Sequence, residues 1–311
     1  MKKTALLLAV ALAASIFLSG CKKAKPNIEK LTFTYVTSPL NIPSIIEKEQ
    51  RIFEKTFDGI PVDYAEITSG AEQTQALASG DVQVLYAVGA TSVILSAANG
   101  ADIKVLNMYS RSPKAFCLYS KDAAINSPAD LRGKKIAGPA GTNLHELLTA
   151  YLASGGMTLS DVDYVSMAIP AAKAALDGGS VDVAMVAGAV AYNCQMQGYH
   201  KVTDGENLIC AIIAVAVTGD FYKNNPEIIK KLSLAQSEIA SYMKENTDKS
   251  FQTVADKLGL DIAAVKEMAD YYDFSTELSK SDIEGFQKTA DFMYESKMIE
   301  KPFDVNSLFI K

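Results

Sequence analysis

Apolar and polar positions repeat with two different periods along the first third of the chain. Residues 31–36, LTFTYV, alternate as a half-buried β-strand does. Further β-type runs follow at residues 61–66, 82–86 and 103–108. Between these runs, helical spacing predicts helices over residues 42–53, 70–78 and 90–98. Strands separated by helices of this length indicate βαβ units, so this region is predicted to be an α/β lobe with a mostly parallel sheet.

The same order of elements returns in residues 126–148, NSPADLRGKKIAGPAGTNLHELL. A strand is predicted over residues 135–138, a turn over residues 139–141, and a helix beginning at Asn143 with Thr142 as its cap. Backbone N–H groups at a helix start lack partners, and the macrodipole is positive there. The turn is therefore a candidate site for an anion or a polar group, and a capped turn with nothing bound is the alternative.

An internal repeat links the two halves. Residues 76–90, ALASGDVQVLYAVGA, align with residues 175–189, ALDGGSVDVAMVAGA, with seven identities at a single offset of 99. Chance similarity between two stretches rich in Ala, Val and Gly is the alternative. The repeat predicts two α/β lobes of like topology.

The last third of the chain is predicted to be helical, over residues 225–246, 261–271 and 281–296. These helices have no sheet of their own, so we expect them to pack on the first lobe. An apolar run at residues 208–217 follows the second lobe. The chain would then cross between lobes near residues 109–115 and again near residues 210–218. This predicts lobe I at 31–112 plus 215–311, lobe II at 113–214, and a cleft beside a hinge.

Ligands of open α/β sheets bind beyond the carboxyl ends of the strands. In lobe I this rule selects the loops 38–41, 68–70 and 88–91, and in lobe II the loops 141–143, 169–171 and 187–189. Their Gly, Ser, Thr and Ala residues let backbone amides approach a ligand, although each position could also be a simple cap or turn. The candidates from these loops are Ser38, Pro39, Asn41, Thr68, Ser69, Gly70, Gly89, Ala90, Gly141, Thr142, Asn143 and Gly188.

Three further residues are candidates because of their side chains. His145 lies on the first turn of the predicted helix and could donate to or accept from a ligand, or be a surface histidine. Tyr192 could stack on a ligand or line the core. Arg111, in a predicted crossover, could reach an anionic group. Glu72 and Glu146 each begin a helix near the cleft, where a carboxylate stabilises the dipole without any acid–base role.

Composition and charge narrow the function classes. The 311 residues carry a formal charge of −6 with a pI near 5.1, and 49% are apolar. No basic cluster with interleaved aromatics occurs, so nucleic acid is not an expected partner. The chain contains no GxSxG, HExxH or Walker motif, so we expect no enzyme activity.

The N-terminus is typical of a targeting signal. Lys2 and Lys3 precede an apolar run at residues 4–18 that is too short to span a membrane comfortably. Residues 18–21, Leu-Ser-Gly-Cys, resemble the bacterial lipobox, which implies a signal peptide at 1–20, diacylation of Cys21 and a tether at 21–30. A plain signal peptide with an incidental cysteine is the alternative. Removal of residues 1–20, which contain Lys2 and Lys3, leaves 28 basic and 36 acidic side chains, a charge of −8.

Cysteine usage excludes a disulfide framework and a structural zinc site. Cys117, Cys194 and Cys210 remain beside two histidines, and no pair has CxxC spacing. We interpret the three as buried thiols, with one disulfide between Cys194 and Cys210 as the alternative. No metal and no cofactor is expected.

Several segments of the sequence, among them residues 126–148 and 175–189 described above, resemble the solute-binding proteins of bacterial ABC importers. The group is the one for aliphatic sulfonates, taurine, nitrate and thiamine-pyrimidine precursors (SsuA/THI5-like, or NMT1). The similarity covers nearly the whole mature chain. It is strongest at residues 127–135, at Gly141 and Thr142 with His145, at the LxxGxVDVAxV run of residues 176–186, and at residues 220–237. The resemblance implies a two-lobe, periplasmic-binding-protein-like (type II) α/β fold with a hinge of two crossovers.

The family also implies ligand contacts at Ser38, Pro39, Ser69, Gly70, Gly89, Thr142 and Asn143. Many members place Trp-x-Pro where this chain has Ala187-Gly188-Ala189, and this chain has no tryptophan. A small edge there indicates a bulkier ligand, or one that is held by other residues. The cysteine-rich iron motif of the pyrimidine-synthase relatives is also missing.

The sequence therefore predicts a lipid-anchored, extracytoplasmic, monomeric protein that closes on a small solute and delivers it to an ABC permease. The solute would be a sulfonate- or taurine-like anion, or a pyrimidine-like heterocycle. One alternative is a surface lipoprotein that senses a ligand. Another is an extracellular enzyme on the same scaffold that uses His145 with a nearby carboxylate.

Overall fold

The computed structural model describes residues 28–310. The predicted signal peptide, Cys21 and most of the predicted tether lie outside these residues. Within the described part of the chain, no helix is both long enough and apolar enough to cross a bilayer.

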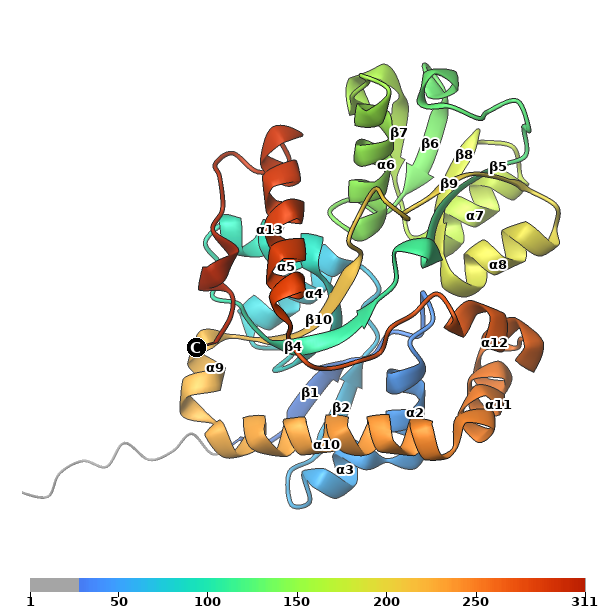
Figure 1. Ribbon diagram of the computed structural model, residues 1–311. Coiled ribbons are helices and arrows are strands. Elements are labelled where there is room, and N and C mark those ends of the chain that lie inside the picture. The colour runs from blue at the N-terminus through green and yellow to red at the C-terminus, as the bar shows by residue number, and fades with distance from the viewer. Residues whose placement is uncertain (1–27, 311) are drawn as a thin grey trace, which may run out of the picture.

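Two bodies of sheet and helix are joined by two chain crossings (Figure 1). The strands of lobe I are β1 (Leu31–Thr34), β2 (Val62–Ala65), β3 (Leu85–Gly89), β4 (Lys104–Arg111) and β10 (Ile212–Val217). β1 and β2 pair in parallel, and β10 lies between β3 and β4 and runs antiparallel to both. The N–H of Thr34 donates to the carbonyl of Val84 at 3.0 Å, beside a parallel bridge from Phe33 to Val84. The strand order of lobe I is therefore β2-β1-β3-β10-β4.

The strands of lobe II are β5 (Phe116–Ser120), β6 (Lys135–Gly138), β7 (Asp163–Ser166), β8 (Val183–Ala187) and β9 (His200–Asp204). They form one sheet in the order β7-β6-β8-β5-β9. β6 is parallel to β7 and β8, whereas β5 is antiparallel to β8 and β9. The positions at which we divide the lobes, after residues 112 and 214, stay a prediction.

The two sheets have the same order when β1 is matched with β6, β3 with β8, and β10 with β5. This is the like topology that the internal repeat predicts. In each sheet four of the five strands run in one direction, so the prediction of mostly parallel sheets is confirmed, and the antiparallel strand is β10 in lobe I and β5 in lobe II. The reason is that β5 and β10 enter their sheets from the hinge, and so run against their neighbours.

Helices cover both sheets. Those of lobe I are α2 (Ile42–Gln50), α3 (Ile52–Thr56), α4 (Gly70–Ser79) and α5 (Ala90–Ala98), and those of lobe II are α6 (Asn143–Ser154), α7 (Ile169–Asp177) and α8 (Gly188–Met196). The helix predicted over 42–53 breaks at Arg51, whose left-handed backbone (φ 54°) separates α2 from α3. The strand predicted over 82–86 lies three residues later, at β3.

The C-terminal third contributes α9 (Gly219–Asn224), α10 (Pro226–Glu245), α11 (Thr247–Leu258), α12 (Ile262–Ala269) and α13 (Lys280–Glu295). Short 3₁₀ turns occur at Pro113–Ala115, Pro128–Leu131, Leu159–Asp161 and Val305–Ser307. α10 runs along the base of lobe I and packs on α2 and α3, as expected (Figure 1). The sequence prediction missed two of these helices, α9 and α11. Two others also touch lobe II, since α12 contacts α8 and α13 contacts α6.

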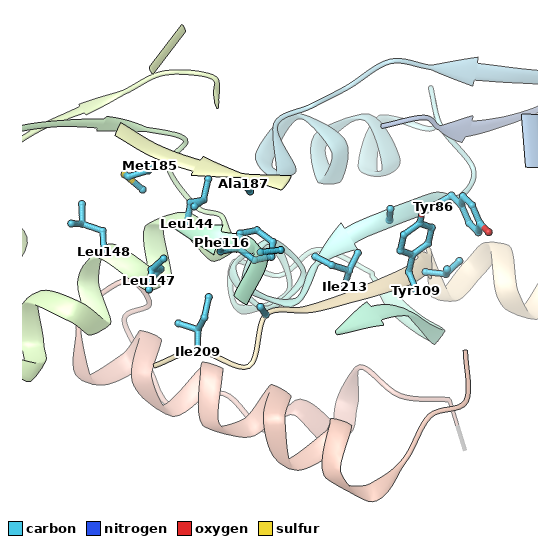
Figure 2. Close-up of a cluster of buried hydrophobic side chains, with 14 of the residues drawn as sticks. Tyr86, Tyr109, Phe116, Leu144, Leu147, Leu148, Met185, Ala187, Ile209 and Ile213 are labelled. Atoms are coloured by element: carbon cyan, nitrogen blue, oxygen red, sulfur yellow. The ribbon is translucent and has the colours of Figure 1, made fainter. Parts of the chain in front are cut away.

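One apolar cluster continues from lobe to lobe through the crossings (Figure 2). Tyr86 and Tyr109 belong to its lobe I end, Leu144 and Met185 to its lobe II end, and Ile213 lies between them. The hinge therefore lies inside buried hydrophobic packing.

The two crossings are also tied to each other. The N–H of Ser112 donates to the carbonyl of Ala211 at 3.3 Å, just beyond the paired ends of β4 and β10. Cys194 and Cys210 are free thiols, so the alternative of a disulfide between them is wrong.

Candidate ligand-binding cleft

A cavity of about 90 Å³ lies where the strand ends of the two lobes face each other. The loops that the strand-end rule selects contain nine of its lining residues: Ser38, Pro39, Asn41, Thr68, Gly70, Gly89, Thr142, Asn143 and Ile169. The other lining residues are Val36, Gln73, Ala87, Ser92, Phe116, Pro139, Leu144 and Ile213. The lining contains no charged side chain.

The loop between β1 and α2 forms one wall. Asn41 is 3% exposed, and its Nδ2 donates to the carbonyls of Val36 (2.8 Å) and Ser38 (3.3 Å), which fixes the loop. The Oγ of Ser38 is buried beside the cavity and has no protein partner. A hydroxyl in this situation can both donate and accept, so it can serve a bound molecule.

The start of α4 forms the next wall. Ser69 caps this helix, with its Oγ accepting from the N–H of Glu72 at 3.4 Å. Gln73, 3% exposed, donates through Nε2 to the carbonyl of Ile67 at 2.8 Å, and its Oε1 has no partner. Gly70 is required here because a Cβ at this position would lie 2.0 Å from the Oγ of Ser92.

Lobe II contributes Asn143, the first residue of α6. Its side chain is 2% exposed, its Oδ1 accepts from the hydroxyl of Thr91 at 3.0 Å, and its Nδ2 has no partner. Thr142 stands at the predicted N-cap position, but its hydroxyl donates to the carbonyl of Pro139 at 3.0 Å and caps nothing. The amides that begin α6 therefore have no side-chain cap.

Several helix starts share this property around the cavity. α5, α6 and α7 all begin at lining residues or next to them, and their N-cap residues make no side-chain capping bond. α2 differs, because the N–H of Ser44 in its first turn donates to the hydroxyl of Tyr109 at 3.1 Å. Free N–H groups and converging positive dipole ends favour negative charge. Because no lysine or arginine lines the cavity, neutral donors supply all of the polarity that the protein offers to a ligand there.

The lobes meet directly around the cavity. The Oγ of Ser92 on α5 donates to the carbonyl of Gly141 at 2.8 Å, and the N–H of Ala189 donates to the carbonyl of Pro39 at 3.1 Å. A Cβ on Gly188 would lie 1.7 Å from the Pro39 oxygen, so the backbones are in contact. The cleft is therefore closed in this structure.

The same contact corrects the interpretation of residues 187–189. The small residues there indicated either a bulkier ligand or one held by other residues, and only the first alternative conflicts with the structure. Instead they admit the backbone of Pro39, and the space is filled by the opposite lobe.

Arg111 is already fully engaged by its own chain. Its Nε and Nη2 donate to the carboxylate of Asp282 at 2.6 and 2.7 Å, and its remaining N–H groups bond Ser275 and Glu277. Arg111 thus holds β4 against the segment that leads into α13. It does not line the cavity, and we leave it out of the proposed site.

His145 lies behind the cavity wall. Its Nδ1 accepts from the N–H of Gly141 at 3.2 Å, and its ring stacks on Tyr164 with 5.2 Å between centroids. Burial lowers the pKa of His145, so the ring is neutral at neutral pH. His145 therefore shapes the Gly141 turn and does not face the cavity.

The remaining candidates surround the cavity or lie apart from it. Ser69 and Ala90 take part in the helix starts, without being lining residues. Tyr192 lines a second space of about 250 Å³ on the other side of Gly188, together with Tyr119 and Tyr271. In residues 28–310, no three His, Cys, Asp or Glu side chains are grouped as metal ligands.

The sequence prediction missed two lining residues, Gln73 in α4 and Ser92 in α5, which lie about one helical turn after the N-cap residues of these helices. The strand-end rule selects loops, and these residues lie beyond them. Helical spacing from Ser69 and Gly89, at i+4 and i+3, would have found both.

Two lobes with equivalent sheets, closed over a small cavity by helix starts, define a periplasmic-binding-protein-like solute-binding fold. The NMT1/THI5-like family model matches residues 42–250, and the chain belongs to this family.

Relatives and solved structures agree with this class. A protein of Escherichia coli named for binding aliphatic sulfonates is 25% identical over 276 residues, which cover 85% of this chain and 84% of the relative. The taurine-binding periplasmic protein of Escherichia coli is 31% identical over 204 residues, 64% of this chain and 62% of the relative. The alkanesulfonate-binding protein SsuA from Xanthomonas axonopodis pv. citri, solved with bound MOPS, has a TM-score of 0.80 at 23% identity. The match covers 92% of this chain and 99% of that one.

Proposed function

We propose that this protein is the lipid-anchored, extracytoplasmic solute-binding component of an ABC importer. It captures a small organic anion of the sulfonate or taurine class in the cleft and delivers it to the permease. The binding proteins for sulfonates and taurine among its relatives support both the class of solute and a location outside the cytoplasm.

The proposal depends mainly on three polar atoms around the closed cavity. Asn143 Nδ2, Ser38 Oγ and Gln73 Oε1 are buried and have no partner in the protein. Buried polar groups are nearly always hydrogen-bonded, so their pairing points to a bound molecule. Asn143 offers a donor to an anionic oxygen, and Gln73 offers an acceptor to an amine or a hydroxyl.

Charge favours a sulfonate over a pyrimidine-like heterocycle, and the size of the cavity admits a short sulfonate. At about 10–15 Å³ for each water-sized centre, a cavity of 90 Å³ holds about six to nine non-hydrogen atoms. Taurine and the short alkanesulfonates lie in this range. The uncapped helix starts of α5, α6 and α7 favour a negatively charged group such as a sulfonate.

Anchoring depends on Cys21, and delivery on a permease that recognises the closed lobes. A chain with Cys21→Ser should leave the membrane fraction, whereas the parent chain should remain there and carry a diacylated N-terminal cysteine by mass spectrometry. Retention of the Cys21→Ser chain in membranes would contradict the anchor.

The binding test uses calorimetry with taurine, alkanesulfonates of increasing length, nitrate and a pyrimidine. We expect tightest binding among the short sulfonates. Asn143→Ala should weaken binding by about 10- to 100-fold, because one buried donor lost to an anion costs about 1–3 kcal/mol. Asn193→Ala, at an exposed position on α8, is the matched control and should bind like wild type. Equal affinity in both variants would remove Asn143 from the site.

A further inference from the structure

Glu146 is a carboxylic acid buried at the surface where the lobes meet. It lies in the first turn of α6 and is 4% exposed. Its Oε2 is 2.5 Å from the hydroxyl of Thr91 on α5, and its Oε1 is 2.9 Å from the hydroxyl of Thr289 on α13. Both partners belong to lobe I, so both bonds of this carboxyl group cross the cleft.

No cation compensates a charge on Glu146. In the described part of the chain, no Lys, Arg or His forms an ion pair with it. α5 carries no ionisable side chain, and α13 brings Lys288, which acts on the neighbouring Cys210. On its own helix the adjacent His145 is turned towards Gly141 and stays neutral. Burial raises the pKa of Glu146, although its two threonine bonds act in the opposite direction.

The hydrogen bonds around Thr91 point to a protonated acid. The single O–H of Thr91 lies 3.0 Å from Asn143 Oδ1 and 2.5 Å from Glu146 Oε2. If Glu146 is ionised, both neighbours are acceptors and one of them lacks a proton. If Glu146 is protonated, it donates to Thr91, Thr91 donates to Asn143, and Thr289 donates to the other carboxyl oxygen. Each of the three contacts between Thr289, Glu146, Thr91 and Asn143 then contains one proton to donate.

Opening the cleft would reverse this state. Separation of the lobes withdraws Thr91 and Thr289 from α6 and exposes Glu146 to water. An exposed glutamate is ionised at neutral pH.

We propose that closure of the lobes over a solute takes up one proton from solvent at Glu146, so that the protein holds its solute more tightly in acidic than in alkaline solution. This rests on the proposed function in one respect, that closure accompanies solute capture. Glu146 is then a residue that positions α6 and its neighbour Asn143, without touching the solute itself.

The direction of the pH effect follows from linkage. The closed form has the higher pKa, so closing binds a proton between the open-state and closed-state pKa values. Closure is unaffected below the ordinary pKa of an exposed carboxyl group. Above it, closure weakens by up to about tenfold per pH unit, and levels off past the raised pKa.

The first measurement uses X-ray scattering on the purified protein without solute. The wild-type radius of gyration should increase from about pH 5 to about pH 8, as the closed fraction falls. Glu146→Gln should stay compact at both values, because the amide can donate to one threonine and accept from the other. Glu72→Gln is the matched control, since Glu72 holds the corresponding first-turn position of α4 and is exposed. Identical pH profiles for wild type and Glu146→Gln would overturn the proposal.

The second measurement titrates taurine by calorimetry in two buffers with different ionisation enthalpies. Binding of taurine near pH 7 should be accompanied by proton uptake in wild type and by none in Glu146→Gln. Binding of taurine with no proton uptake would refute the role of Glu146 and leave the proposed function intact. If neither taurine nor any alkanesulfonate binds, the proposed function is wrong, and the scattering experiment still decides on Glu146.

A second variant covers the case in which Glu146→Gln does not fold. Thr289→Val keeps the acid and removes one of the two bonds that cross the cleft. It should bind taurine more weakly than wild type at every pH and retain the decrease in affinity with rising pH. Affinity that is independent of pH in this variant would contradict proton uptake at Glu146.

Discussion

The ends of β3 and β8 occupy equivalent places in the two lobes, yet they contact the opposite lobe by different means. β3 leads into α5 with Thr91 and Ser92, whose hydroxyls reach Asn143, Glu146 and the carbonyl of Gly141. β8 leads into α8 with Gly188, which has no side chain and lets its backbone lie against Pro39. One lobe thus contacts its partner through side-chain hydroxyls, and the other through its backbone, which fits closely against Pro39 and donates the N–H of Ala189 to the Pro39 carbonyl. The duplicated scaffold supplies the position, and the residues at each strand end decide the kind of contact.

A side chain placed in the close contact between Gly188 and Pro39 should have the largest effect on taurine affinity. In Gly188→Val the new side chain would overlap the Pro39 carbonyl, so the lobes cannot close fully. We expect a loss of about 3 kcal/mol, or about 100-fold in taurine affinity, together with a larger radius of gyration. Gly198→Val is the control, because Gly198 also has a positive φ but has open space around it. Equal losses in both variants would mean that backbone strain alone, and not the contact with Pro39, is responsible.

Removing the hydroxyl at the end of β3 should have the next largest effect. Thr91→Val keeps the shape of the side chain but leaves Asn143 Oδ1 and Glu146 without their shared partner. The expected cost to closure is about 2 kcal/mol, or about 30-fold in affinity. Thr253→Val, on α11 away from the cleft, should bind normally in the same calorimetric titration. Wild-type affinity in Thr91→Val would show that the contact at β8 alone holds the lobes together.

Ser92→Ala should have a smaller effect, since it removes one neutral hydrogen bond to the carbonyl of Gly141. We expect about 1 kcal/mol, or about fivefold in affinity. Ser96→Ala, one turn further along α5, serves as the control. A loss as large as that of Thr91→Val would mean that the two hydroxyls act as one unit.

Glu47 tests whether a buried acid must lie between the lobes to affect binding. It lies within lobe I, bonds the N–H of Phe53 and the hydroxyl of Tyr64, and burial raises its pKa to about 8. Because this pKa is raised in the folded state, the stabilisation by Glu47 is complete in acid and is lost as pH rises through about 8. Glu47→Gln should therefore reduce the fall of the melting temperature between about pH 5 and about pH 8 and leave taurine affinity unchanged. An altered affinity would contradict the distinction between acids within a lobe and acids between lobes.

Local patterns predicted the lobes, their like topology and much of the cavity. Ser38, Gly70 and Asn143 follow from the rule that ligands bind beyond strand ends, since the rule needs only the order of strands and helices. The direction of β5 and β10 could not be predicted in this way, because it depends on where the chain enters each sheet after a crossing.

The misplaced candidates have long-range causes. Arg111 lies in a predicted crossover beside the cleft, which made it a candidate. Its guanidinium instead pairs with Asp282, which lies 171 residues later in the chain. The space expected at Gly188 is filled by Pro39 from the other lobe. Glu146 has the sequence features of an ordinary first-turn acid, and its burial depends on Thr289, which lies 143 residues away on α13. None of these pairings leaves a local pattern.

The continuous apolar cluster through the crossings has a consequence for how the two lobes can move apart (Figure 2). Ile213 lies between the two ends of this cluster, so the packing at the crossings forms a pivot that both lobes share. The contacts at the edge of the cleft are of another kind, because they include single hydrogen bonds such as those of Ser92 and Thr289. The lobes can therefore rotate about a pivot that stays buried, while the hydrogen bonds at the edge are exchanged for bonds to water.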